Sequence, residues 1–370
     1  MRLNSNTTFY LTLLLFINLS TIINAQVKKD STTNRVGAGG THWFVFPFVY
    51  YTPETDLAFG VGGNINYKID SLSNPSSISG SGYYTINNQY NLGTSADIYF
   101  DSNKKLLNLS FNHSNVFDYF YGIGPTTPDI ANDAYLQKNN SFDVKYQMQV
   151  SNKNFKIGGE FTHRDMSVLD KKDNPYLVSD SVEGSNGGKT SGLGIIFNWD
   201  SRDNVFYPNT GGYYQVNVTF FSKAFGSDFD FNQYIIDFRR YMGLITQQVL
   251  AFQLYYEFDT AYPPFYNLPL LGGSSNMRGY LKGRYRDRQY YNIQAEYRFA
   301  QLIWRFGLVF FVGIGDVASA LDKFSVANVK PSYGFGLRFR LEEVQKLDLK
   351  MDIGWGQNTS GVYFGINQAF

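Results

Sequence analysis

The stretch Tyr291–Phe299 reads YNIQAEYRF, and every second residue in it is aromatic or aliphatic. The residues between them form the polar series Asn292, Gln294, Glu296 and Arg298. An alternation with a period of two predicts a β-strand, because successive side chains of a strand point to opposite faces. One face of this strand would therefore be apolar, and the other would be polar and charged.

The same alternation recurs from residue 42 to residue 370, with clusters of Gly, Asn, Asp, Ser and Pro between the segments. A soluble sandwich would also alternate, but so many long strands would need a very large core. In a membrane barrel, the apolar face meets lipid and the polar face surrounds a lumen. We therefore predict an all-β fold, a closed antiparallel transmembrane β-barrel of the outer-membrane type. Sixteen strands are expected, at 42–51, 56–68, 77–87, 92–100, 105–115, 140–150, 154–166, 190–200, 211–223, 228–241, 246–258, 286–299, 305–315, 331–341, 346–355 and 361–370.

The longest connections of this barrel all follow odd-numbered strands, at 116–139, 167–189, 259–285 and 316–330. Connections after odd-numbered strands lie together at one end of an antiparallel barrel. With both ends of the chain in the periplasm, that end faces outward, where barrels of this class carry their longer loops. The even strand number and the position of the long loops therefore support the same architecture.

The composition limits the functions open to the chain. Its 370 residues include 32 Lys and Arg against 31 Asp and Glu, and this near balance argues against a nucleic-acid binder. With 0 Cys and 3 His, neither a metal site nor a cofactor is expected. The histidines fall outside the expected strands or near their ends, and we expect no serine beside one of them on the lipid face. We therefore expect no enzymatic activity.

The first residues have the features of a secretory signal. Arg2 precedes the apolar stretch Leu11–Leu19, and Ala25 offers a small residue for cleavage. The chain is expected to divide into a signal peptide (1–25), a short periplasmic leader (26–41) and a transmembrane barrel domain (42–370).

A glycine-rich segment, Pro269–Tyr280, reads PLLGGSSNMRGY and falls in the loop after the eleventh expected strand. It resembles the loop motif of the BamA/TamA superfamily of outer-membrane translocators, also called bacterial surface antigens. In that family, an apolar-Arg-Gly-aromatic tip folds back into the barrel. The matching residues here are Gly272, Gly273, Met277, Arg278, Gly279 and Tyr280.

Two further segments carry the resemblance. The turn before the ninth strand is similar to a family turn, and Phe370 resembles the terminal aromatic signal of outer-membrane barrels. Gly313 stands where the family often has an Asp facing the loop Arg, and residues 26–41 cannot hold the soluble periplasmic repeats called POTRA domains. The residues of the turn motif are Asp200, Arg202, Asp203, Pro208 and Gly211.

An arginine that enters a barrel lumen needs a carboxylate, because an unpaired buried guanidinium is costly. By strand parity, the inward carboxylates from the twelfth strand onward are Glu296, Asp348 and Asp352. We expect Arg278 to pair with one or more of them.

The resemblance implies a non-enzymatic role in envelope biogenesis in the outer membrane of a Gram-negative bacterium. The protein would insert or export proteins or lipids, or serve as an accessory subunit of such a machine. Its expected partners are outer-membrane lipids and the assembly machinery or lipoproteins, and in the family the seam between the first and last strands can open. A passive pore or a structural surface antigen is the alternative.

Overall fold

The computed structural model describes residues 41–52, 56–130, 133–151, 154–245, 247–343 and 346–370. The expected signal peptide and all of the expected leader except Thr41 lie outside these residues.

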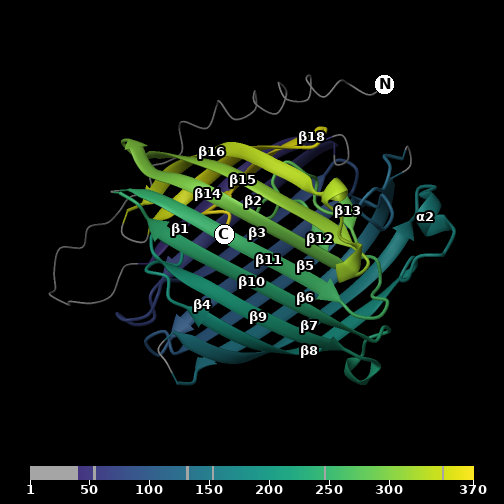
Figure 1. Cartoon of the computed structure of the whole chain (residues 1–370), viewed down its shortest axis with the longest axis horizontal. Helices are drawn as coiled ribbons and strands as arrows, with labels where there is room; N and C mark the ends of the chain where they lie inside the picture. The colour runs from purple at the N-terminus through teal and green to yellow at the C-terminus, as the bar shows by residue number, and fades with distance from the viewer. Residues whose placement is uncertain (1–40, 53–55, 131–132, 152–153, 246, 344–345) are drawn as a thin grey trace.

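Sixteen strands form one antiparallel sheet in the order in which they occur in the sequence (Figure 1). Each expected strand is present, and the all-β fold class is confirmed. A two-stranded ribbon, β12 (Leu270–Leu271) with β13 (Tyr285–Arg286), lies outside the sheet and was not anticipated. The strands of the large sheet are β1 (His42–Thr52), β2 (Asp56–Tyr67), β3 (Ser76–Thr85), β4 (Tyr90–Phe100), β5 (Lys105–Tyr119), β6 (Ala134–Gln149), β7 (Phe155–Asp170), β8 (Gly187–Asp200), β9 (Gly211–Phe221), β10 (Phe231–Gly243), β11 (Gln248–Asp259), β14 (Gln289–Ile303), β15 (Phe306–Ala318), β16 (Lys330–Glu342), β17 (Leu347–Gly356) and β18 (Thr359–Ile366).

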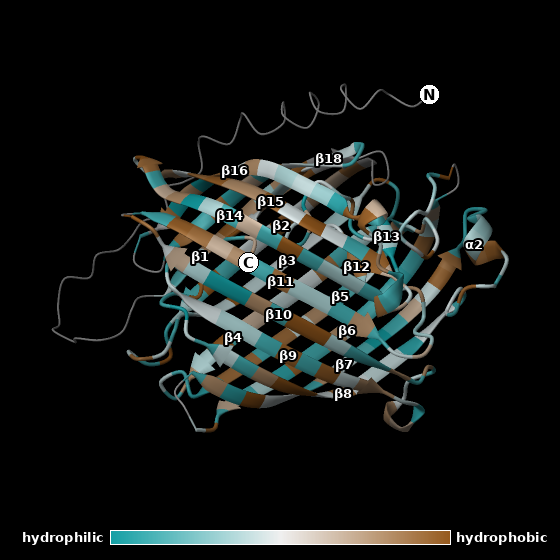
Figure 2. Cartoon of the chain, viewed as in Figure 1, coloured by the Kyte–Doolittle hydropathy of each residue, from teal (hydrophilic) through white to brown (hydrophobic). Residues whose placement is uncertain are grey.

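The two faces of the sheet differ as the alternation predicts. In β14, Glu296 and Arg298 on the inner face are 0% exposed, whereas Ile293 on the outer face is 46% exposed. Figure 2 shows the resulting bands of polar and apolar residues along the strands. An apolar outer face around a charged interior is the reverse of a soluble core and is typical of a membrane barrel.

The two ends of the barrel carry different connections. The described parts of the long segments 120–133, 171–186, 260–288 and 319–329 lie at one end, here called the loop end (Figure 1). The described parts of the turns after the even-numbered strands of the large sheet lie at the other, the turn end. The only α-helix among the described residues, α2 (Pro175–Val178), belongs to the loop end. No helix in the described part of the chain is long and apolar enough to cross a bilayer.

β1 and β18 are the end strands of the sheet, and between their described residues the structure contains no backbone pairing. We call the junction between these two strands the seam. The last expected strand, 361–370, is wrong at its end, because β18 stops at Ile366. Asn367 adopts a left-handed conformation with φ of 66°, and the residues after it turn into the barrel. Gln368 would otherwise continue the lipid-facing series of β18 with a polar amide.

Two neighbouring residues of β4 test the assignment of the faces. Ala96 shares the outer face with Leu92, whereas Ser95 faces the lumen, as Asp97 does. We expect Ala96→Arg to lower the free energy of unfolding in lipid vesicles by about 2–4 kcal/mol, because it puts a charge into hydrocarbon. Ser95→Arg, one residue away, should cost less than about 1 kcal/mol because its charge meets water. Equal costs in denaturant titrations would contradict the orientation of the strand.

Candidate functional site

The segment between β11 and β14, residues 260–288, is the candidate functional site, and we call it the arginine loop. It begins and ends at the loop end, where β12 and β13 pair at its base, and its middle enters the lumen. Met277 and Arg278 are fully buried, and Tyr280 is 1% exposed. Gly272 and Gly273 follow β12, and the amide of Gly273 donates a hydrogen bond to the carbonyl of Tyr280 at 3.2 Å. The expected tip therefore lies inside the barrel.

Arg278 bridges two carboxylates from different parts of the wall. Its guanidinium forms one ion pair with Glu296 of β14 and another with Asp352 of β17, the latter at 2.7 Å. The same group lies over the ring of Phe311 of β15, with 3.6 Å between its carbon and the ring centroid. Burial alone would lower the pKa of Arg278, but the two carboxylates outweigh it and raise that pKa above its usual value. The tip therefore carries a permanent positive charge.

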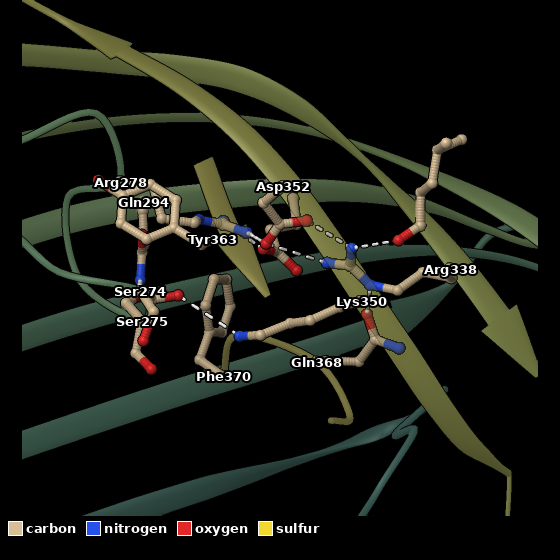
Figure 3. Close-up of polar contacts among 12 residues, drawn as sticks. Ser274, Ser275, Arg278, Gln294, Arg338, Lys350, Asp352, Tyr363, Gln368 and Phe370 are labelled. Carbon is tan, nitrogen blue, oxygen red and sulfur yellow. Dashed lines mark hydrogen bonds and ion pairs between the residues drawn. The ribbon is translucent and has the colours of Figure 1, made fainter. Parts of the chain in front are cut away.

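Each carboxylate that holds Arg278 also binds a second arginine. Arg338 reaches Asp352 from the side opposite Arg278, at 2.5 Å (Figure 3), and Arg298 bonds to Glu296 at 2.8 Å. Asp348, the third expected partner, does not contact Arg278. It pairs with Arg340 of β16 instead, because it lies four residues before Asp352 on β17 and so nearer the turn end. All these ionic side chains are at least 95% buried, so loss of one would leave its partner poorly compensated.

Backbone contacts seat the tip against the last three strands. The amide of Gly279 donates to the hydroxyl of Tyr363 at 2.9 Å, and the hydroxyl of Tyr280 donates to the carbonyl of Pro331 at 2.8 Å. Gly279 has φ of 110°, a conformation that glycine adopts readily. A Cβ on Gly354 would lie 2.8 Å from the backbone carbon of Arg278. The tip therefore packs against β17 at Gly354, a position that has no side chain.

The absence of a carboxylate at Gly313 also has a structural explanation. A Cβ on Gly313 would lie 3.1 Å from the Cβ of Gln294 and 3.6 Å from the sulfur of Met277, so the tip and its neighbour occupy that space. Asp316, further along β15, bonds to Lys330 rather than to the loop. The carboxylate that the sequence resemblance places on β15 is thus supplied by Asp352, two strands away.

The turn motif lies at the turn end, between β8 and β9. Asp200 and Arg202 form an ion pair at 2.8 Å, and a carboxylate oxygen of Asp203 accepts the amides of Asn209 and Thr210. Pro208 is buried inside this turn, and Gly211 begins β9. These residues do not contact Arg278. They form a turn that places the buried Tyr207 at the turn end of the lumen.

Phe370 lies inside the barrel and not on its lipid face. It is buried with Tyr207, Tyr241, Val249 and Ala251, which come from the turn before β9 and from β10 and β11. The alternation could not reveal this position, because Phe370 is in phase with the outward residues of β18.

The loop end of the barrel contains a small hydrophobic core that the sequence did not reveal. Phe120, Leu177 and Phe265, from three different long connections, are each 0% exposed and pack together. Arg286 donates to the carbonyls of Tyr119 at 2.9 Å and Phe265 at 3.3 Å. The loops after β5, β7 and β11 therefore pack together at the loop end.

One expectation about enzymatic residues was wrong. Nδ1 of His163 on β7 lies 2.7 Å from the hydroxyl of Ser191 on β8, and both belong to the outward series near the loop end. Strand register, which sequence could not supply, brings them together. Ser191 is only 1% exposed, and no described carboxylate bonds to the His163 ring. A buried hydroxyl without an oriented base is a poor nucleophile.

Comparisons with known proteins bear on this geometry. Residues 57–370 match the model of the Omp85 superfamily domain. The fold is similar to BamA from Haemophilus ducreyi lacking POTRA domains 1–3, with a TM-score of 0.53 and 15% identity over 88% of this chain and 69% of that one. It is also similar to CdiB from Acinetobacter baumannii, with a TM-score of 0.56 and 13% identity over 88% of this chain and 59% of that one. For CdiB from Escherichia coli the TM-score is 0.59 and the identity is 11%, over 90% of this chain and 63% of that one. The chain thus spans under two thirds of either CdiB chain, and no curated protein sequence matches it.

Replacing Arg278 tests the ionic contacts of the tip. We expect Arg278→Ala to lower the free energy of unfolding by about 2–5 kcal/mol, because it leaves two buried carboxylates each with one fewer partner. The released loop should also raise channel conductance in planar bilayers. Arg288→Ala, which changes an arginine of the same loop outside the ionic cluster, serves as the control. Unchanged conductance together with unchanged heat-modifiable migration on gels would contradict this account of the tip.

Replacing Gly354 tests the seat without touching any charge. Gly354→Ala should displace the tip and lower stability by about 1–3 kcal/mol, because the added methyl group overlaps the backbone of Arg278. Trypsin should then cut the loop faster, at Arg278 and Lys282. Gly80→Ala on β3 is the matched control, because its Cβ would meet nothing closer than 3.8 Å. If trypsin cuts both variants at the wild-type rate, the tip does not rest on Gly354.

Proposed function

Because the chain belongs to the Omp85 superfamily, we propose that it is an outer-membrane barrel that inserts or exports proteins or lipids, or that serves as an accessory subunit of such a machine. The membership confirms the resemblance that the loop motif indicated. The role we propose is non-enzymatic and is set in the outer membrane of a Gram-negative bacterium. Outer-membrane lipids and an assembly machine or lipoproteins are its proposed partners.

The observation that carries this proposal is the attachment of the arginine loop to the last strands of the sheet. Arg278, Gly279 and Tyr280 bind side chains and backbone of β16, β17 and β18, and β18 borders the seam. Movement of β18 would therefore disturb the tip. A loop tied in this way to an unpaired sheet edge suits a barrel whose wall must open and close.

The same features speak against a passive pore. The tip occupies the lumen, and the loops that carry Phe120, Leu177 and Phe265 pack together at its loop end. Some charges of the inner wall are already paired with each other, such as Asp237 with Arg239. A diffusion pore would need an unobstructed path, so we rank the pore and the surface antigen below a role in biogenesis.

A reconstitution experiment tests the proposed function. Purified protein is placed in phosphatidylcholine vesicles, and a urea-unfolded outer-membrane barrel protein is added as client. Client folding is measured as heat-modifiable migration. We expect folding about tenfold faster than in empty vesicles, a fall of about 1.4 kcal/mol in the barrier.

The controls separate insertion from a pore. Arg278→Ala should lose most of the acceleration, and Arg288→Ala should keep it. A steady conductance with a sharp size limit, in vesicles where the client folds no faster than in empty ones, would favour the pore and overturn the proposal.

A further inference from the structure

The last residues of the sequence cross the lumen. β18 ends at Ile366, and the segment Asn367–Phe370 turns inward at the left-handed Asn367, whose amide donates to the carbonyl of Asp348 at 2.7 Å. Ala369 and Phe370 are then buried against β10 and β11, which are separated from β18 by several strands in the sheet. We call Asn367–Phe370 the tail segment.

The tail segment has polar as well as apolar partners in the lumen. The side-chain oxygen of Gln368 accepts a hydrogen bond from Nε of Arg338 at 2.8 Å (Figure 3). The side-chain amide of Gln368 donates to Asp348 at 2.9 Å. The carbonyl of Phe370 accepts a hydrogen bond from the guanidinium of Arg298 at 2.9 Å. The central carbon of that guanidinium also lies 5.2 Å from the centroid of the Phe370 ring. The side chain of Gln368 and the carbonyl of Phe370 therefore both have partners in the lumen, whereas Oδ1 of Asn367, at the turn itself, is buried without one.

These contacts close a ring with the arginine loop. Arg278 binds Asp352, Asp352 binds Arg338, and Arg338 binds Gln368 of the tail segment. On the other side, Phe370 binds Arg298, Arg298 binds Glu296, and Glu296 binds Arg278. The tail segment is therefore the bridge between the two arms of the ionic cluster that hold the tip.

We propose that the inner wall formed by β10, β11 and β14 is a docking site for the tail segment, and that docking couples the arginine loop to the strand at the seam. When the segment is docked, its contacts hold Arg298 and Arg338 against Glu296 and Asp352, the two acids that bind Arg278. When it leaves, the two arms lose their bridge, the tip loosens and β18 is free to move. This inference deepens the proposed function, but the docking itself does not rest on it.

A disulfide tests the docking directly, because the natural chain contains 0 Cys. In the double variant A251C/A369C, both cysteines lie in the cluster that buries Phe370. We expect mild oxidation of native membranes to cross-link most of the protein, seen as a mobility shift on non-reducing gels. A295C/A369C is the matched control, since Ala295 lies on the outer series of β14, and it should stay uncross-linked. V249C/A369C provides a second pair should the first fold poorly.

The coupling is measured on the same protein. In planar bilayers, oxidised A251C/A369C should open about fivefold less often than the reduced form, and a reductant should restore opening. Absence of a cross-link in both lumenal pairs, or a cross-link in the control, would overturn the docking site. A cross-link that leaves the opening frequency unchanged would overturn the coupling. Neither result depends on client folding, so failure here is distinguishable from failure of the proposed function.

Discussion

The structure depends on one buried cation, the guanidinium of Arg278, held between Glu296 and Asp352. A charge in the lumen of a barrel is tolerated only if carboxylates meet it in good geometry. The two carboxylates come from β14 and β17, so the position of the loop and the curvature of the wall fix each other. A wall of different curvature would separate the acids, and a loop of different depth would miss them.

Much of the remaining architecture supports this ion pair. Gly354 leaves room for the backbone of the tip, Tyr363 binds the amide of Gly279, and the carbonyl of Pro331 accepts a hydrogen bond from the hydroxyl of Tyr280. Arg338 and Arg298 give each of the two acids a second cationic partner, so that three arginines surround two carboxylates. The charges therefore form one network, in which removal of any member changes the environment of the others. Through Tyr363 the network also reaches β18, the end strand of the sheet, in a chain that belongs to the Omp85 superfamily.

The sequence predicted the strands well because a period of two is a local property, visible in each segment without knowledge of its neighbours. It also placed Arg278 in the lumen, through the loop motif, and narrowed its partners to three acids by parity. It could not choose between Asp348 and Asp352, because that choice depends on how deep the tip descends. The position of Phe370 and the approach of His163 to Ser191 were missed for a related reason: both depend on contacts or register between distant strands.

A double-mutant cycle tests the central ion pair most directly. The free energy of unfolding in lipid vesicles is measured for wild type, Arg278→Ala, Asp352→Asn and the double variant. If Arg278 is held by Asp352, the two changes are coupled by about 1–3 kcal/mol, and the double variant is less impaired than the sum of the single ones. Additivity within about 0.5 kcal/mol would contradict the account, because two groups that do not interact contribute independently.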